Sequence, residues 1–291
     1  MRCACIDIGS NTTRLLVGES REGRLHEVLA QRTFTRLGTA KRGPIPEAKV
    51  EEVAAVVASQ VRMAQECGAE TIRVVATAAI RQAPNREAFC EAVESAAGLP
   101  VEVLSGDDEA RLAFAGATRS LQHAPLGEIG VVDVGGGSSE LVVGTMPAGV
   151  SWSASFRVGS AFLAESYLRS DPPSIDELER IRAHVAGVFE GLEAPQPEVA
   201  YAVGGSATSL RRVVGAELNH ATLAHGLRVL GEAPADEVAR RYELHPDRVR
   251  VLPAGMLLLD EAARVFGCPL RICSGGLREG VVLEELAAVG S

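Results

Sequence analysis

The chain alternates short apolar runs with longer stretches of helical periodicity, which is the pattern of an α/β protein. Two apolar runs, 131–134 and 141–143, flank three consecutive glycines and predict a strand, a tight turn and a second strand. The start of the chain repeats this plan, with runs at 5–8 and 15–17 around a short polar turn. Further strands are predicted near residues 24–37, 71–77, 101–104, 152–158, 199–203 and 270–273. Helices are predicted near 46–68, 85–97, 105–121, 175–191, 234–242 and 248–266, directly after residue 203, and at the end of the chain.

The two strand–turn–strand units indicate an internal duplication. Their aspartates, Asp7 and Asp133, lie 133 minus 7, or 126, residues apart, which is too long for a solenoid repeat and suits a duplicated domain. A chain of 291 residues is long enough for two domains with separate cores. We therefore expect an α/β fold with two similar lobes, 1–122 and 123–291, where the last helix is free to pack on the first lobe.

The triple-glycine turn has the composition of a phosphate-binding loop. Glycines leave no side chains over the turn, so that backbone N–H groups can approach an anion closely. Asp133 and Glu140 bracket this turn with carboxylates, which would repel a phosphate unless a cation sits between them. The sequence therefore predicts a phosphate loop with a hard divalent ion, most simply Mg²⁺. The competing interpretation is a glycine-rich hairpin with two solvated acids.

Two charged positions in the first half are candidates for the same chemistry. Arg81 follows a strand at the end where ligands of α/β sheets usually bind, and its guanidinium can grip phosphate in a bidentate manner. Three acids, Asp107, Asp108 and Glu109, crowd the first turn of one predicted helix. Capping needs one acid, so one of the others is expected to reach a ligand site. The competing interpretations are a plain surface arginine and a well-capped helix.

Composition narrows the classes of function. The net charge of −9 opposes binding of a polyanion over the whole surface, so a phosphate-rich ligand needs a local site. Aromatic residues make up 4% of the chain, which leaves few platforms for base stacking and argues against nucleic-acid binding. No apolar run reaches the length of a membrane span, and no signal-peptide pattern precedes the first strand. The six cysteines show no zinc spacing and are expected to be reduced, mostly buried thiols. Residues 39–46 are predicted to form a basic loop, either phosphate-facing or merely solvated.

Seven segments in order resemble the exopolyphosphatase and guanosine pentaphosphate phosphatase family, which belongs to the actin-like, sugar-kinase and Hsp70 ATPase-domain superfamily. They are DIGSNTTRLLV, TRLG, ATAAIRQAPN, SGDDEARL, DVGGGSSEL, VGGSATSL and SGGLREG. The resemblance spans nearly the whole chain and implies two ribonuclease-H-like lobes with an active site in the cleft between them. It also implies Mg²⁺-dependent hydrolysis of a terminal phosphoanhydride bond.

The resemblance also assigns roles to single residues. Glu109 matches the general base that aligns the attacking water, and Asp133 and Glu140 match the acids around the metal and water. The residues that match phosphate-binding positions are Ser10, Asn11, Arg81, Gly136, Gly137 and Ser138. Gly205, Ser206 and Arg278 lie in segments that border the same cleft in the family, with less defined roles. A homodimer in the cytoplasm is expected from the resemblance alone.

The sequence departs from the longer family members in two places. It ends at residue 291, so the helical HD-type region that follows in many relatives is not expected, and this puts processive action on very long polyphosphate in doubt. Residues 39–42 replace the usual glycine-leucine run after the TRLG segment. Inorganic polyphosphate, with short chains favoured, and guanosine pentaphosphate both stay open as substrates, as does a requirement for K⁺. A kinase on the same fold and a non-catalytic alarmone or nucleotide sensor are two further functions that these residues would suit.

Overall fold

The computed structural model describes residues 1–22, 24–37, 43–121 and 125–289. The chain divides into two compact units. The first contains residues 1–120 and 275–291, and the second contains residues 121–274. The sequence analysis placed residues 123–291 in the second domain and allowed the last helix to pack on the first. In the structure that terminal segment belongs to the first unit.

The first unit is built on a five-stranded mixed sheet. Its strands are β1 (Arg2–Ile8), β2 (Thr13–Arg21), β3 (Arg24–Thr33), β4 (Thr71–Ala76) and β5 (Val101–Val103). They lie in the order β3-β2-β1-β4-β5. The first three strands form an antiparallel meander, whereas β4 runs parallel to both β1 and β5.

The second unit repeats this arrangement with one added strand. Its strands are β6 (Ile129–Val134), β7 (Ser139–Thr145), β8 (Gly149–Phe156), β9 (Val199–Val203), β10 (Glu217–Leu218) and β11 (Leu270–Ile272). Their order is β10-β11-β9-β6-β7-β8, with an antiparallel β6-β7-β8 meander and with β9 parallel to β6 and β11. The two sheets therefore share one topology, in which an antiparallel meander is extended by two parallel strands. This confirms the predicted α/β fold and is what a duplicated ribonuclease-H-like domain requires.

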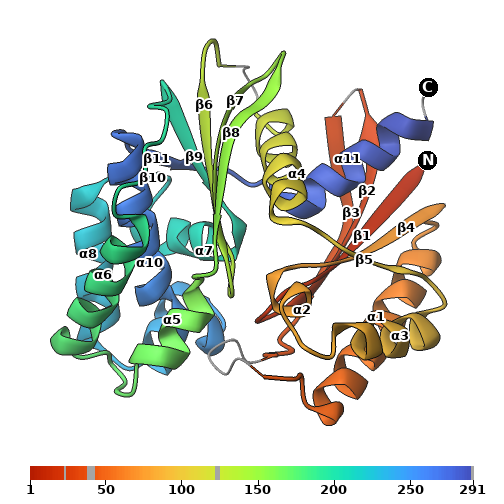
Figure 1. Ribbon diagram of the computed structural model, residues 1–291, viewed down its shortest axis with the longest axis horizontal. Helices are drawn as coiled ribbons and strands as arrows, with labels where there is room; N and C mark the ends of the chain where they lie inside the picture. Colours follow the sequence, from red (N-terminus) through yellow and green to blue (C-terminus); the bar gives the residue numbers. More distant parts are fainter. Residues whose placement is uncertain (23, 38–42, 122–124, 290–291) are drawn as a thin grey trace. The chain divides into compact units, whose positions relative to one another are not determined.

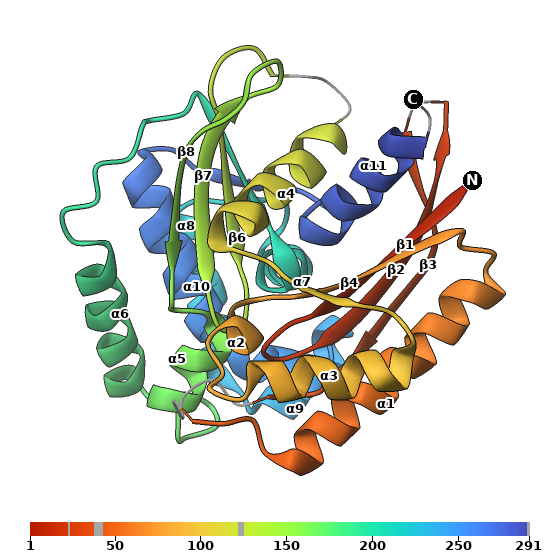
Figure 2. The same ribbon diagram turned by 45° about the vertical axis from the view of Figure 1, so that its right-hand side comes forward.

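Helices cover both faces of the first sheet (Figure 2). They are α1 (Glu47–Glu66), α2 (Ala78–Arg81), α3 (Arg86–Ala97), α4 (Gly106–Arg119) and α11 (Leu277–Val289). The apolar side chains of β1 alternate between two clusters: Ile6 packs in the cluster that includes residues of α1 and α3, and Cys5 in the cluster that includes residues of α4 and α11. Helix α11 lies beside β1 and β2, although it follows them by more than 250 residues (Figure 1). The last helix thus completes one face of the first sheet.

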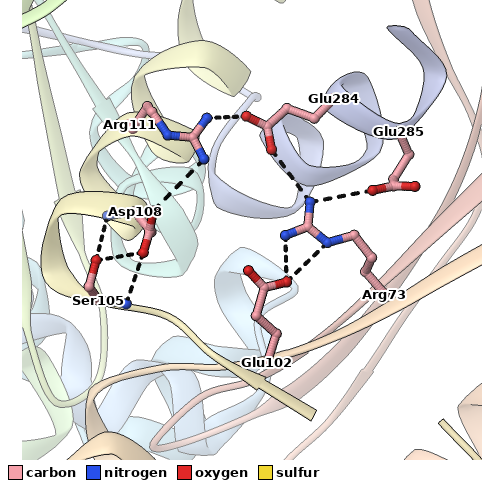
Figure 3. A network of polar contacts seen from close by, with 7 residues as sticks. All are labelled: Arg73, Glu102, Ser105, Asp108, Arg111, Glu284 and Glu285. Carbon is pink, nitrogen blue, oxygen red and sulfur yellow. Dashed lines mark hydrogen bonds and ion pairs between the residues drawn. The ribbon is translucent and has the colours of Figure 1, made fainter. Parts of the chain in front are cut away.

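A polar network ties α11 to its surroundings (Figure 3). Arg73 of β4 donates to Glu284 (3.4 Å) and Glu285 (3.5 Å) on α11, and to Glu102 on β5 (2.5 Å). Glu284 also accepts a hydrogen bond from Arg111 of α4. One carboxylate of α11 is therefore shared by the sheet and by α4.

The second unit is assembled around one long helix. Its helices are α5 (Ser160–Tyr167), α6 (Ile175–Phe189), α7 (Gly204–Val214), α8 (His220–Glu232), α9 (Ala235–Tyr242) and α10 (Pro246–Phe266). Helix α10 packs against each of the other five and against β6. It has fourteen buried residues among its twenty-one, and these form the centre of the second core.

Most predicted elements are confirmed, and the differences are short. The structure adds α2, α5, α8 and β10, which the sequence analysis did not predict, and it ends α6 at residue 189. The predicted basic loop lies largely in residues 38–42, outside the described part of the chain. Of the six cysteines, Cys3, Cys5 and Cys273 are buried and the other three are half-buried, and none forms a disulfide among the described residues. None of the described helices combines the length and apolar character needed to cross a bilayer.

Candidate active site

The turn between β1 and β2 is held from one side by the segment that follows β3. The carbonyls of Ser10 and Asn11 accept hydrogen bonds from the N–H groups of Leu37 (2.8 Å) and Arg36 (3.2 Å). A trans peptide group points its N–H in the direction opposite to its carbonyl. The N–H groups of Asn11 and Thr12 therefore point away from that supporting segment.

The triple-glycine turn between β6 and β7 is held in the same manner by helix α5. The carbonyls of Gly135 and Gly136 accept hydrogen bonds from the N–H groups of Ser160 (2.9 Å) and Ala161 (3.0 Å). The N–H groups of Gly136 and Gly137 must then point away from α5. Among the described residues, neither N–H makes a backbone hydrogen bond. These two donors are thus directed to one side and available to an anion.

The two turns have the same internal geometry. Gly9 N–H donates to the Thr12 carbonyl at 3.0 Å, and Gly135 N–H donates to the Ser138 carbonyl at 3.0 Å. The second pair follows the first by 135 minus 9 and 138 minus 12, or 126 residues in both cases. A Cβ on either glycine would lie 3.1 Å from the carbonyl that closes its turn. The duplication therefore extends to individual hydrogen bonds.

The charges beside the two turns differ. In the first unit Asp7 lies opposite Arg14 across β1 and β2, and their side chains form an ion pair at 3.4 Å. In the second unit Asp133 lies opposite Glu140 across β6 and β7. Directly opposed like charges destabilise a strand pair unless another group compensates them. The two turns therefore differ in the charge that faces the aspartate of each.

Glu140 is fixed by its neighbours. It is 3% exposed, and its Oε1 accepts a hydrogen bond from Ser155 Oγ at 2.9 Å. Ser155 is its partner on β8. This contact fixes one carboxylate oxygen.

Asp133 lies against the start of helix α7. A Cβ on Gly204 would lie 2.3 Å from Asp133 Oδ1, and Gly204 has a φ of +84°. Both the close approach and the left-handed backbone require glycine there. The glycine thus lets the carboxylate of β6 contact the first turn of α7.

The next two residues of α7 are also in close contact with neighbours. A Cβ on Gly205 would lie 2.7–3.1 Å from the guanidinium of Arg248, a residue of α10 that is 6% exposed. Ser206 is fully buried, and its Oγ lies 2.8 Å from where a Cβ of Gly255 would be. Its hydroxyl has no hydrogen-bond partner among the described residues. The side chain of Ser206 therefore packs between helices, and its backbone N–H is the group that the first turn of α7 presents.

The three acids in the first turn of α4 have three different environments. Asp108 forms a capping box with Ser105, in which Asp108 N–H donates to Ser105 Oγ at 3.1 Å. Asp107 is exposed. Glu109 is 5% exposed and forms an ion pair with Arg81. Glu109 is therefore the one buried acid of the three, and its role at a ligand site stays a prediction.

Arg81 ends the short helix α2, directly after β4. Its Nη1 donates to the Leu104 carbonyl at 2.5 Å and to Glu109. The structure thus joins two of the predicted site residues, the candidate phosphate ligand and the candidate base.

Arg278 lies in the first turn of helix α11, beside the β1–β2 hairpin. Its Nη1 donates weakly to the Leu15 carbonyl at 3.5 Å. Burial raises the pKa of Asp7, and the nearby guanidinium groups of Arg14 and Arg278 oppose that rise. Arg278 therefore belongs to the electrostatic environment of Asp7.

The predicted residues thus gather in separate groups. Arg81 and Glu109 form one group in the first unit, and the first turn with Asp7 and Arg278 forms another. In the second unit the triple-glycine turn, Asp133, Glu140 and the start of α7 form a third. Their predicted roles in phosphate binding and catalysis stay predictions.

The sequence analysis did not include three residues that the structure places in these groups. Asp7 was noted only as part of the repeated pattern, although its 126-residue relation to Asp133 marks an equivalent position. Arg14 follows from the same offset, because it corresponds to Glu140. No local sequence signal marks Arg248, because one arginine in a helix resembles any surface arginine.

Comparison with known proteins identifies the family. The model of the Ppx/GppA phosphatase family matches residues 16–289. Exopolyphosphatase 2 of Mycobacterium tuberculosis is 31% identical to this chain, and the match covers 90% of each protein. Exopolyphosphatase 1 of the same organism is 29% identical, and the match covers 98% of this chain and 88% of the relative. The crystal structure of the Aquifex aeolicus member of the Ppx/GppA family is similar with a TM-score of 0.82 and 30% identity, covering 100% of this chain and 99% of that one. The chain belongs to the Ppx/GppA phosphatase family.

Proposed function

We propose that the protein is an exopolyphosphatase, which hydrolyses the terminal phosphoanhydride bond of inorganic polyphosphate, with short chains favoured, and releases orthophosphate. The observation that carries this proposal is the direction of the N–H groups in the two equivalent turns. Each turn has its carbonyls bound on one side, so that the N–H groups of the same peptides point to the other. N–H groups directed in this way suit the oxygens of a phosphate group. The names of the Mycobacterium tuberculosis relatives favour polyphosphate.

The carboxylates of Asp133 and Glu140 are suited to hold Mg²⁺. Among the described residues, no group of three or more His, Cys, Asp or Glu side chains is arranged to hold a metal ion. Mg²⁺ does not need such a cage, because it often uses one or two carboxylates together with waters and substrate phosphates. The opposed pair on β6 and β7 fits that requirement, and bound Mg²⁺ would neutralise charge on the phosphate oxygens.

Glu109 is proposed as the general base that orients the attacking water. In the structure its carboxylate is paired with Arg81. A phosphate group competes for that guanidinium, because arginine grips phosphate as well as carboxylate. Substrate binding would then free Glu109 to accept a proton while Arg81 neutralises the phosphate. Phosphoryl transfer asks the protein for these two contributions, positioning and charge neutralisation.

Replacement of Glu109 by Gln tests this role. The amide keeps the shape of the side chain and can still bond to Arg81, but it accepts no proton. General-base assistance is worth on the order of 10²–10⁴ in rate. We expect kcat for phosphate release to fall by about that factor, with substrate affinity and thermal stability near those of the wild type.

The matched control is Asp107→Asn, which removes an exposed charge from the same helical turn. This variant should keep its turnover. Near-normal kcat in pure Glu109→Gln protein would remove Glu109 from the mechanism.

A comparison of kcat/KM identifies the preferred substrate. The candidates are tripolyphosphate, long polyphosphate and guanosine pentaphosphate, measured at one Mg²⁺ and salt concentration. The proposal expects the highest value with tripolyphosphate. A higher value with guanosine pentaphosphate would assign the other activity of the family. Phosphate release without an acceptor excludes a kinase, whereas binding without Mg²⁺-dependent turnover would indicate a sensor.

A further inference from the structure

A row of charged side chains crosses the first sheet next to its phosphate turn. Asp7 on β1 lies directly opposite Arg14 on β2, and Arg14 lies directly opposite Arg32 on β3. Residues that are directly opposite on neighbouring strands point to the same face of the sheet. This face is the one on which α11 packs, because Cys5 and Leu16, which alternate in phase with Asp7 and Arg14, cluster with residues of α11.

Arg278 of α11 adds a third guanidinium to this face. We call Arg14, Arg32 and Arg278 the arginine cluster. Arg14 and Arg278 are mostly buried, with side chains that are 20% and 17% exposed. Arg32 lies directly opposite Arg14, and desolvation together with the charges of Arg14 and Arg278 lowers its pKa.

The acids near the arginine cluster do not neutralise the charge of Arg32. Asp7 is paired with Arg14 at 3.4 Å, and Glu279 lies 3.7 Å from Arg278. Within the described part of the chain, Arg32 has neither an ion pair nor a hydrogen bond from its side chain. It is exposed, on the edge strand β3, opposite a like charge. Such an arrangement destabilises a protein unless an anion binds.

We propose that Arg32, supported by Arg14 and Arg278, forms a subsite for a phosphoryl group of the ligand other than the one that is hydrolysed. The chemistry it selects is a dianionic or trianionic phosphate, to which the guanidinium fork of Arg32 donates. The proposal deepens the proposed function and rests on it, because an inner phosphate of polyphosphate and the diphosphate of a guanosine nucleotide both have this chemistry. Arg32 would then determine how strongly the site prefers ligands with more than one phosphate.

The test is equilibrium binding by calorimetry in EDTA, which requires no turnover and so does not depend on catalysis. The ligands are tripolyphosphate and guanosine pentaphosphate, measured with the wild type and with Arg32→Gln at one salt concentration. We expect Arg32→Gln to weaken binding about tenfold, the effect of losing one charge-assisted contact. Arg32→Lys should recover part of the loss, because it restores the charge without the fork.

The matched control is Arg24→Gln, which removes an exposed arginine from the opposite end of the same strand. Its affinity should equal that of the wild type. A loss of affinity in Arg32→Gln for tripolyphosphate, for guanosine pentaphosphate or for both supports the subsite. It also shows which of the two ligands the subsite binds. Equal affinity of Arg32→Gln and the wild type for both ligands, or an equal loss in Arg24→Gln, would overturn the proposal.

Thermal unfolding separates a ligand-binding role from a structural one. Because Arg32 faces a like charge, the ligand-free Arg32→Gln protein should be as stable as the wild type or more stable. A clear loss of stability would mean that Arg32 supports the fold, and it would count against the subsite.

Discussion

One pair of equivalent residues sets the two halves of the molecule apart. Arg14 and Glu140 occupy the same position in the repeated sheet, each opposite the aspartate of its own turn. The first half has an arginine here and compensates its aspartate internally. The second half has a glutamate, so that two carboxylates lie opposite each other. The two halves of the duplicated scaffold therefore differ in the charge beside their turns through a change at a single position.

Gly204 provides a test of how Asp133 is placed. Its φ of +84° makes alanine unfavourable by about 1 kcal/mol, and a Cβ would also displace the carboxylate of Asp133. That carboxylate can rotate away, so we expect little further loss of stability in Gly204→Ala. We expect phosphate release to fall by on the order of tenfold to a hundredfold, because catalytic groups tolerate little displacement.

The control for this variant is Gly191→Ala. Gly191 has a φ of +73°, and a Cβ there would contact nothing within 4 Å. Denaturant unfolding should show similar losses in both variants, and activity assays should show a defect in Gly204→Ala alone. Equal activities would mean that the position of Asp133 does not matter for the reaction.

The sequence predicted these residues to different extents. The three acids exceed what one helix cap needs, which marked residues 107–109, and the family resemblance then selected Glu109, which the structure shows buried. The burial of Ser206 against Gly255 could not be predicted, because it depends on how α7 and α10 pack. Local patterns reveal which residues are unusual for their element, whereas their contacts depend on elements that are distant in the sequence.

At the level of elements, capping explains where helices begin. Helices α4, α6 and α8 each start with a capping box, formed by Ser105, Ser174 and Asn219 with the residue three positions on. The sequence analysis placed the start of α6 near residue 175, where the structure has it. Helix α8 was not predicted although it has the same capping signal, because Gly226 and Gly231 interrupt its helical pattern. Helix α5 begins at a glycine without a side-chain cap, so its start gave no local signal.

The capping box of α6 predicts a dependence of stability on acid pH. Burial alone would raise the pKa of Glu177, but hydrogen bonds from Ser170 Oγ and from the N–H groups of Ser174, Arg169 and Ser170 outweigh it and lower the pKa to about 2. A depressed pKa stabilises the fold above the unfolded value of 4.5, and this stabilisation is lost as the pH falls from there to about 2.

The variant Glu177→Gln should therefore be less stable than the wild type at neutral pH, with a difference that shrinks between about pH 4.5 and about pH 2. Denaturant unfolding at several pH values measures it. Glu179→Gln, which changes an exposed acid on the same helix, is the control and should show a small and constant difference. A difference for Glu177→Gln that does not change with pH would contradict the assignment.

At the level of the whole molecule, the first unit is discontinuous in sequence. Residues 275–291 return to it, and α11 packs on α4 at very short range. A Cβ on Gly116 would lie 1.9 Å from the carbonyl oxygen of Gly276, and a Cβ on Gly280 would lie 2.1 Å from that of Leu112. The glycines of the SGGLREG segment therefore have a packing role, which the sequence analysis did not assign to them.

Gly116→Ala should destabilise the first unit by about 1–3 kcal/mol, because the backbone of α11 must move to admit the methyl group. Gly187→Ala is the control, since Gly187 is also helical and a Cβ there contacts nothing within 4 Å. That change should be neutral or stabilising by up to about 1 kcal/mol, as alanine favours helix. Hydrogen exchange should assign the loss in Gly116→Ala to residues 1–120. An unchanged stability would show that α4 and α11 can separate at no cost.

The return of α11 has a consequence for synthesis on the ribosome. Residues 121–274 are contiguous, so the second unit can fold as soon as they emerge, whereas the first unit must wait for the final residues of the chain. Until then, the sheet face that bears Cys3, Cys5 and Leu16 lacks Val281 and Val282, its partners from α11. The half that is made first is thus completed last, and during that delay its uncovered thiols and apolar strands are open to oxidation, aggregation and chaperone binding.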